Sequence, residues 1–137
     1  MTQTTAQPQS RTISADAKQT ALTAAKQASE RWKQAFNRQD AAGCAAQYQD
    51  DAIMHARPFG TFTGTAEIRA FWQQLIDDGF ADVEYIEPEF SVLDETQVLL
   101  TSKWKMNQAQ GVIHRELWLK QADGTFKLAE DDFEALA

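Results

Sequence analysis

The chain has 137 residues, enough for one domain with its own hydrophobic core. Its net charge of -7 makes nucleic acid and anionic membranes poor partners, because both attract basic surfaces. The single cysteine, Cys44, cannot form an internal disulfide, and no apolar run approaches the ~20 residues that span a bilayer.

The polar segment MTQTTAQPQS has no basic start followed by an apolar block, so we expect no secretory signal. We expect a cytoplasmic protein with a disordered lead-in over residues 1–12 and a single domain over residues 13–137.

Two helices are predicted at the start of this domain. Ser14 is a suitable N-cap for the first, which extends to Asn37 and repeats apolar residues every three or four positions. Asp40 is a suitable cap for a short second helix that ends at Tyr48.

A short strand over residues 52–54 and a turn-rich segment over 60–64 come next. Thr65 then caps a third helix that ends at Gly79. Its apolar residues fall on one helical face: Ile68, Phe71, Trp72, Leu75 and Ile76.

After this helix the apolar period changes to two, which predicts strands. Pro88 implies that the first of them is an edge strand or contains a bulge. Helices followed by an antiparallel meander indicate the α+β class. The predicted strands cover residues 81–93, 97–106, 112–121 and 125–133.

Three segments resemble the nuclear transport factor 2-like superfamily, which includes ketosteroid isomerases, scytalone dehydratases and polyketide cyclases of the SnoaL type. The segments are WKQAFNRQDAAGCAAQYQDDAIM, GTFTGTAEIRAFWQQL and LKQADGTFKLAEDDFEAL. The resemblance implies a cystatin-like cone, in which three N-terminal helices pack on a curved antiparallel sheet and enclose a pocket. It also implies a dimer.

The same resemblance suggests site residues. Trp32 occupies the position of the isomerases' helix-1 tyrosine, and Glu116 matches their second acid. The position of their catalytic aspartate falls on Ala56, beside His55. Only one of three positions keeps an acid, so standard ketosteroid isomerase activity is not expected.

His55 follows a short apolar strand and can serve as a general base at a cavity mouth, or can simply end the strand in solvent. Asp131 matches a pocket-facing polar position of relatives, although three consecutive acids also suit a solvated edge. His114 shares a strand face with Glu116 by simple alternation, and whether that face or its leucine-rich opposite lines the pocket stays open.

Trp104 alternates with lysines and is expected to point inward. The predicted ligand-contacting set is Trp32, Tyr48, Trp104 and His114. The sequence has no metal-ligand spacing and no glycine-rich phosphate loop, so we expect neither a metal site nor a cofactor.

These residues predict a pocket for a small apolar molecule. One hypothesis is a cofactor-free acid–base enzyme (isomerase, dehydratase or cyclase), with His55 as base and Glu116 or Asp131 orienting it or acting as acid. The other is a binding or assembly module without chemistry. If Ile113, Leu117 and Leu119 form an exposed stripe, a homodimer through the sheet is expected.

Overall fold

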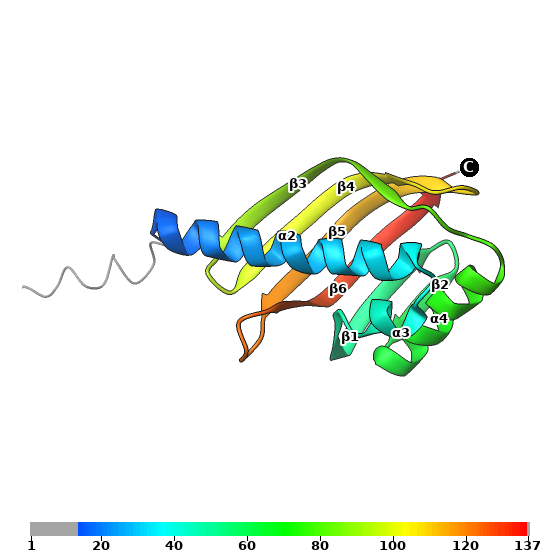
Figure 1. Cartoon of the computed structure of the whole chain (residues 1–137), viewed down its shortest axis with the longest axis horizontal. Coiled ribbons are helices and arrows are strands. Elements are labelled where there is room, and N and C mark those ends of the chain that lie inside the picture. The colour runs from blue at the N-terminus through cyan, green and yellow to red at the C-terminus, as the bar shows by residue number, and fades with distance from the viewer. Residues whose placement is uncertain (1–13, 137) are drawn as a thin grey trace, which may run out of the picture.

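The computed structural model describes residues 14–136, which form three helices and six strands (Figure 1). The lead-in expected over residues 1–12 lies outside the described residues. In chain order the elements are α2 (Ala15–Asn37), α3 (Ala41–Ala45), β1 (Tyr48–Arg57), β2 (Gly60–Thr63), α4 (Thr65–Asp77), β3 (Glu84–Asp94), β4 (Gln97–Lys105), β5 (Gln110–Lys120) and β6 (Phe126–Leu136).

The six strands form one sheet in the order β2-β1-β6-β5-β4-β3. All neighbours are antiparallel except β1 and β6, which run parallel, so the expected antiparallel sheet is in fact mixed at this pair. The α+β class is confirmed. Helix α2 crosses one face of the sheet, while α3 and α4 lie beside β1 and β2 (Figure 1).

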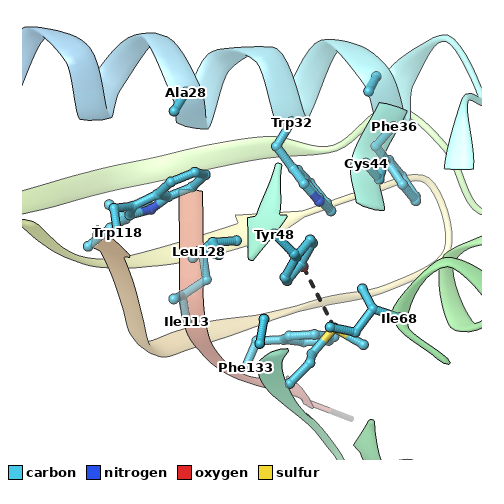
Figure 2. Packing of buried hydrophobic residues seen from close by; sticks show 14 of the residues in the cluster. Ala28, Trp32, Phe36, Cys44, Tyr48, Ile68, Ile113, Trp118, Leu128 and Phe133 are labelled. Carbon is cyan, nitrogen blue, oxygen red and sulfur yellow. Dashed lines mark hydrogen bonds between the residues drawn. The ribbon is translucent and has the colours of Figure 1, made fainter. Parts of the chain in front are cut away.

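Helix α2 begins as predicted, because the Ser14 side chain accepts a hydrogen bond from the Ala17 amide at 3.0 Å. Its buried face changes along its length from alanines to large rings. Alanines allow a close approach to the sheet, whereas Trp32 and Phe36 fill a wider space near the end of the helix. Figure 2 shows both rings projecting from α2 into the core.

The predicted second helix is too long. Helix α3 ends at Ala45, and Tyr48 is the first residue of β1. Ordered pairing with β2 and β6 extends this strand well beyond residues 52–54. The cap predicted at Thr65 is also wrong: Gly64 precedes α4, and the Glu67 carboxylate accepts the Thr63 amide at 2.8 Å.

Pro88 lies in β3, an edge strand whose pairing with β4 shifts between Ile86 and Glu89. Both structural features inferred from this proline are therefore present. An edge position leaves the missing amide facing solvent, and the bulge removes the need for a ladder bond there.

Two bulges decide which side chains of β5 and β6 face the helices. Ile113 of β5 pairs with Phe133 of β6, and the next pair is Arg115 with Asp132, so His114 of β5 has no partner in the ladder. Leu128 of β6 pairs with Trp118 of β5, and the next pair is Glu130 with Leu117, so Ala129 of β6 has no partner in the ladder.

The inner face of β5 consequently holds Ile113, Glu116 and Trp118, all buried, whereas His114 is exposed. Simple alternation along β5 is therefore wrong. Ile113 does not belong to an outer apolar stripe, while Leu117 keeps its expected place on the outer face.

Candidate functional site

Two carboxyl groups face each other on the helix-covered side of the sheet. Glu116 of β5 and Asp131 of β6 are directly opposite in the antiparallel register. Both residues are almost completely buried, at 6% and 2% exposure. Side chains directly opposite on one face have Cβ atoms about 4.5–5.5 Å apart, so the two carboxyls are close neighbours.

Asp131 is held from one side by a chain of hydrogen bonds. The Tyr48 hydroxyl donates to Asp131 Oδ2 at 2.6 Å and accepts from Trp72 Nε1 at 3.3 Å. Because the Tyr48 oxygen accepts the hydrogen bond from the Trp72 N–H, the hydroxyl hydrogen of Tyr48 is available to donate to Asp131. The other carboxyl oxygen, Asp131 Oδ1, has no hydrogen-bond partner within residues 14–136.

Glu116 has a different partner. Its Oε1 accepts a hydrogen bond from Trp118 Nε1 at 3.2 Å, two residues further along β5. Among the described residues, no salt bridge involves Glu116 or Asp131. The two buried acids thus have neutral donors and no cation beside them.

This environment favours the protonated forms. Burial raises the pKa of Asp131 from 3.8 to about 7, opposed by the Tyr48 hydrogen bond, which stabilises the carboxylate. Burial, and next the charge of Asp131, raise the pKa of Glu116 well above its usual range. At neutral pH the pair therefore holds protons, and Asp131 is close to its midpoint.

The pair forms part of the wall of a cavity of about 50 Å³, counted as room for the centres of water molecules. Most of the remaining wall is aromatic or aliphatic, including Trp32, Phe71, Trp72, Tyr85, Trp104 and Phe133. A single water needs roughly 10–15 Å³ on this measure, so the cavity is larger than a water site but narrow. It suits a small or flat molecule.

Several elements place the aromatic wall. Figure 2 shows two of its rings, Trp32 from α2 and Phe133 from β6, in the space between the helix and the sheet. Trp104 of β4 pairs directly with Gly111 of β5, where an added Cβ would lie 2.6 Å from the indole ring. A glycine at this position therefore makes room for the indole.

Two further polar atoms of the wall have no partner within the described chain. They are the indole nitrogens of Trp32 and Trp104, both buried. Buried N–H groups almost always form a hydrogen bond. These two nitrogens and Asp131 Oδ1 belong to residues of the wall, and all three are buried without a hydrogen-bond partner among residues 14–136.

Four of the predicted site residues are brought together here, namely Trp32, Trp104, Glu116 and Asp131. Tyr48 is not part of the wall but lies behind it, hydrogen-bonded to Asp131.

The two histidines are not among the residues that line the cavity, and the structure favours the alternative in which both lie on the solvent side. Met54 and Ala56 of β1 point inward, so His55 between them points outward, where its Nδ1 lies 3.1 Å from Thr61 Oγ1. The bulge turns His114 outward, and its Nε2 lies 2.8 Å from Glu134 Oε1.

Sequence reasoning missed Tyr85 and the polar role of Trp72. Tyr85 is the first inward residue of β3, and the bulge near Pro88 obscures the alternation that would have identified it. Burial, and then the charges of Glu116 and Asp131, raise the pKa of Tyr85. Trp72 fits the core face of α4 by periodicity, which carries no signal for its hydrogen bond to Tyr48.

Within residues 14–136 no group of three or more histidine, cysteine, aspartate or glutamate side chains is arranged to hold a metal ion. No helix among these residues is long and apolar enough to cross a membrane.

Three helices packed on a six-stranded sheet, with a cavity between them, define a small α+β domain similar to proteins with a cystatin-like fold. The SnoaL-like domain model matches residues 29–125, and the chain belongs to this family, within the nuclear transport factor 2-like superfamily. No curated protein matches the chain.

Solved structures share the fold at low identity. A ketosteroid isomerase-like protein from Erwinia carotovora atroseptica SCRI1043 has a TM-score of 0.70 at 18% identity, over 82% of this chain and 93% of its own. A putative scytalone dehydratase from Novosphingobium aromaticivorans DSM 12444 has a TM-score of 0.70 at 12% identity, over 90% and 89%. A hexachlorocyclohexane dehydrochlorinase from Novosphingobium barchaimii LL02 has a TM-score of 0.72 at 11% identity, over 90% and 92%. At these identities the likeness concerns the fold alone.

Proposed function

We propose that this protein binds a small, largely apolar molecule in the aromatic cavity and exchanges a proton with it through Asp131. The observation that carries this proposal is the pair of buried carboxyls, Glu116 and Asp131, in the wall of an otherwise apolar cavity. Buried acids with perturbed pKa values in a cavity are typical of acid–base sites.

Asp131 is suited to the exchange for two reasons. Its pKa of about 7 means that protonated and ionised forms coexist at neutral pH, so the group can donate or accept a proton. Tyr48 occupies Oδ2, so Oδ1 is the oxygen left for a bound molecule. The chemistry that follows is an isomerisation, elimination or cyclisation that needs only proton transfer.

Glu116 has a supporting role in this proposal. It keeps its proton at neutral pH because ionising it beside Asp131 in a buried site is unfavourable. A protonated carboxyl is a hydrogen-bond donor and can hold an oxygen atom of the bound molecule. Names of relatives such as the ketosteroid isomerase-like protein and the scytalone dehydratase support acid–base chemistry in this fold.

The test combines binding and turnover. A panel of small cyclic ketones, enones and alcohols is screened for thermal stabilisation of the parent, and each hit is followed by NMR for chemical conversion. Asp131→Asn keeps the shape and the Tyr48 hydrogen bond, so it should retain binding and lose conversion. Ala109→Phe, at another position in the wall, should weaken binding itself.

Conversion that survives in Asp131→Asn would contradict the proton-transfer role. Binding without any conversion by the parent would leave a binding module, the competing hypothesis. Stabilisation that is unchanged by Ala109→Phe would show that the ligand lies elsewhere.

A further inference from the structure

We propose that the molecule bound in this cavity is a small organic cation, the ammonium form of an alicyclic or aromatic amine, with its nitrogen against Asp131 and Glu116. This inference rests on the proposed function, because it takes the cavity as the ligand site. It adds the charge of the ligand, which the proposed function leaves open.

The first argument is the balance of charge. Within residues 14–136 the cavity wall holds two carboxyls and no lysine, arginine or histidine. The arginines of β1 and β5 lie on the outer face of the sheet, where they form salt bridges. Arg57 pairs with Asp132, and Arg115 pairs with Glu130. Glu116 and Asp131 therefore have no counter-ion among the residues that the structure describes.

The neighbouring elements do not change this balance. Strand β1 contributes the Tyr48 hydroxyl and β3 contributes Tyr85, both of which are neutral at physiological pH. Helices α2 and α4 face the cavity with uncharged side chains, such as Trp32 and Trp72. A ligand cation would favour ionisation of both carboxyls, whereas an anion would find no positive charge in the described wall and would oppose ionisation of Asp131.

The second argument is the free oxygen. Asp131 Oδ1 is buried and has no hydrogen-bond partner within the described chain. An ammonium group carries three donors and no acceptor, so it complements this oxygen and the neighbouring carboxyl. Hydrogen bonds of this kind between ionised groups are about twice as strong as neutral ones.

The third argument is the aromatic composition of the cavity wall. Tryptophan, tyrosine and phenylalanine rings surround the acids, and the faces of such rings attract cations when water is excluded. The indole N–H groups of Trp32 and Trp104, which have no hydrogen-bond partner within residues 14–136, add a second expectation. An oxygen substituent on the amine would give them an acceptor, so an amino alcohol should bind better than the plain amine.

The experiment compares three probes of one shape and different charge: cyclohexylamine, cyclohexanol and cyclohexanecarboxylate. Isothermal titration at pH 7.5 measures each Kd with the full chain. We expect the amine to bind about tenfold or more tightly than the alcohol, and the carboxylate to bind most weakly. The affinity for the amine should rise from pH 5.5 to 8, because the cation displaces protons from the pair.

Two variants and a matched control locate the effect. Asp131→Asn and Glu116→Gln keep side-chain shape, and each should weaken amine binding about tenfold while leaving cyclohexanol unchanged. Asp132→Asn removes an adjacent carboxyl on the outer face and should leave amine binding unchanged. Thermal unfolding of all three variants shows that each is folded.

The inference is overturned if cyclohexanol binds as tightly as cyclohexylamine, or if Asp131→Asn keeps the parent's affinity for the amine. In the first case the cavity is a site for neutral molecules, and the proposed function stands. If none of the three probes binds and the ketone panel also fails, both proposals fail together.

Discussion

Asp131→Asn should make the protein more stable at neutral pH, although it removes a buried and hydrogen-bonded side chain. Asparagine has nearly the same shape, and its amide oxygen can still accept the 2.6 Å hydrogen bond from Tyr48. What disappears is the pH dependence that a buried acid brings to folding.

The direction follows from the pKa of Asp131, which is about 7 in the folded protein and 3.8 as its ordinary value. Below about pH 4 the group is protonated in both states and has no effect. From pH 4 to 7 the unfolded chain ionises while the folded protein does not, so the free energy of unfolding falls. Above about pH 7 Asp131 is ionised in the folded protein as well, so the free energy of unfolding falls no further.

The magnitude comes from the separation of the two values, 3.8 and about 7, which is roughly three pH units. At about 1.4 kcal/mol for each unit the loss in the parent is about 4 kcal/mol. Compared with Asp131→Asn, the parent should therefore be similar at pH 4 and less stable by up to about 4 kcal/mol at pH 8. This is a large part of the stability of a small domain.

Urea unfolding at pH 4, 5, 6, 7 and 8, followed by tryptophan fluorescence and far-UV circular dichroism, measures both curves. Asp132→Asn is the control, because the Arg57 hydrogen bond lowers the pKa of Asp132. That variant should be less stable than the parent at neutral pH, and the difference should vanish as the pH falls below the folded pKa. Parallel curves for Asp131→Asn and the parent from pH 4 to 8 would refute the reasoning.

Three further predictions concern single side chains. His55→Ala should leave ligand binding unchanged in the titrations above, because the ring points to the outer face; a loss of affinity would restore its site role. Tyr48→Phe should raise the pKa of Asp131 further, measured by carboxyl 13C NMR, since the hydroxyl stabilises the carboxylate; an unchanged value would contradict the 2.6 Å bond. On the outer face of the sheet Leu99 pairs with Leu117, and we propose that the protein forms a dimer through this face. Leu117→Lys should then convert the dimer to a monomer in sedimentation, and a monomeric parent would exclude the dimer.

The fold could be predicted because its signals are local. The Ser14 cap and the apolar spacing defined α2, and the change of period after Gly79 marked the start of the sheet. The exact ends of the helices and strands were harder to predict. Nothing in the sequence around Tyr48 separates a helix end from a strand start, since the decision depends on pairing with β6, some eighty residues away.

The site was harder to predict, because alternation fails at a bulge. Glu116 and Asp131 were proposed by comparison with relatives, whereas counting along β5 put Glu116 with His114. Counting along β6 from Leu128 gives the wrong face for Asp131. A bulge is a tertiary feature of two paired strands, so neither strand alone reveals it.

The two bulges also explain how an acid pair comes to lie in a hydrophobic core. If both strands alternated regularly, without bulges at His114 and Ala129, Arg115 would face inward after Ile113, and Glu130 would face inward after Leu128. A core of that kind would bury groups that now form an ion pair in solvent. The bulges instead turn Glu116 and Asp131 inward, opposite each other, while Ile113 and Phe133 stay inside.

This arrangement costs stability, because apolar residues of similar volume would fill the same space without desolvating two acids. Packing alone gives no reason for the wall to contain a carboxyl oxygen and two indole N–H groups that have no hydrogen-bond partner among residues 14–136. A bound molecule with a cationic donor would satisfy Asp131 Oδ1, and an acceptor group on the same molecule would offer a partner to an indole N–H. These polar atoms support the proposal that the cavity holds a ligand, and the two carboxyls in its wall support the proposal that this ligand is a cation.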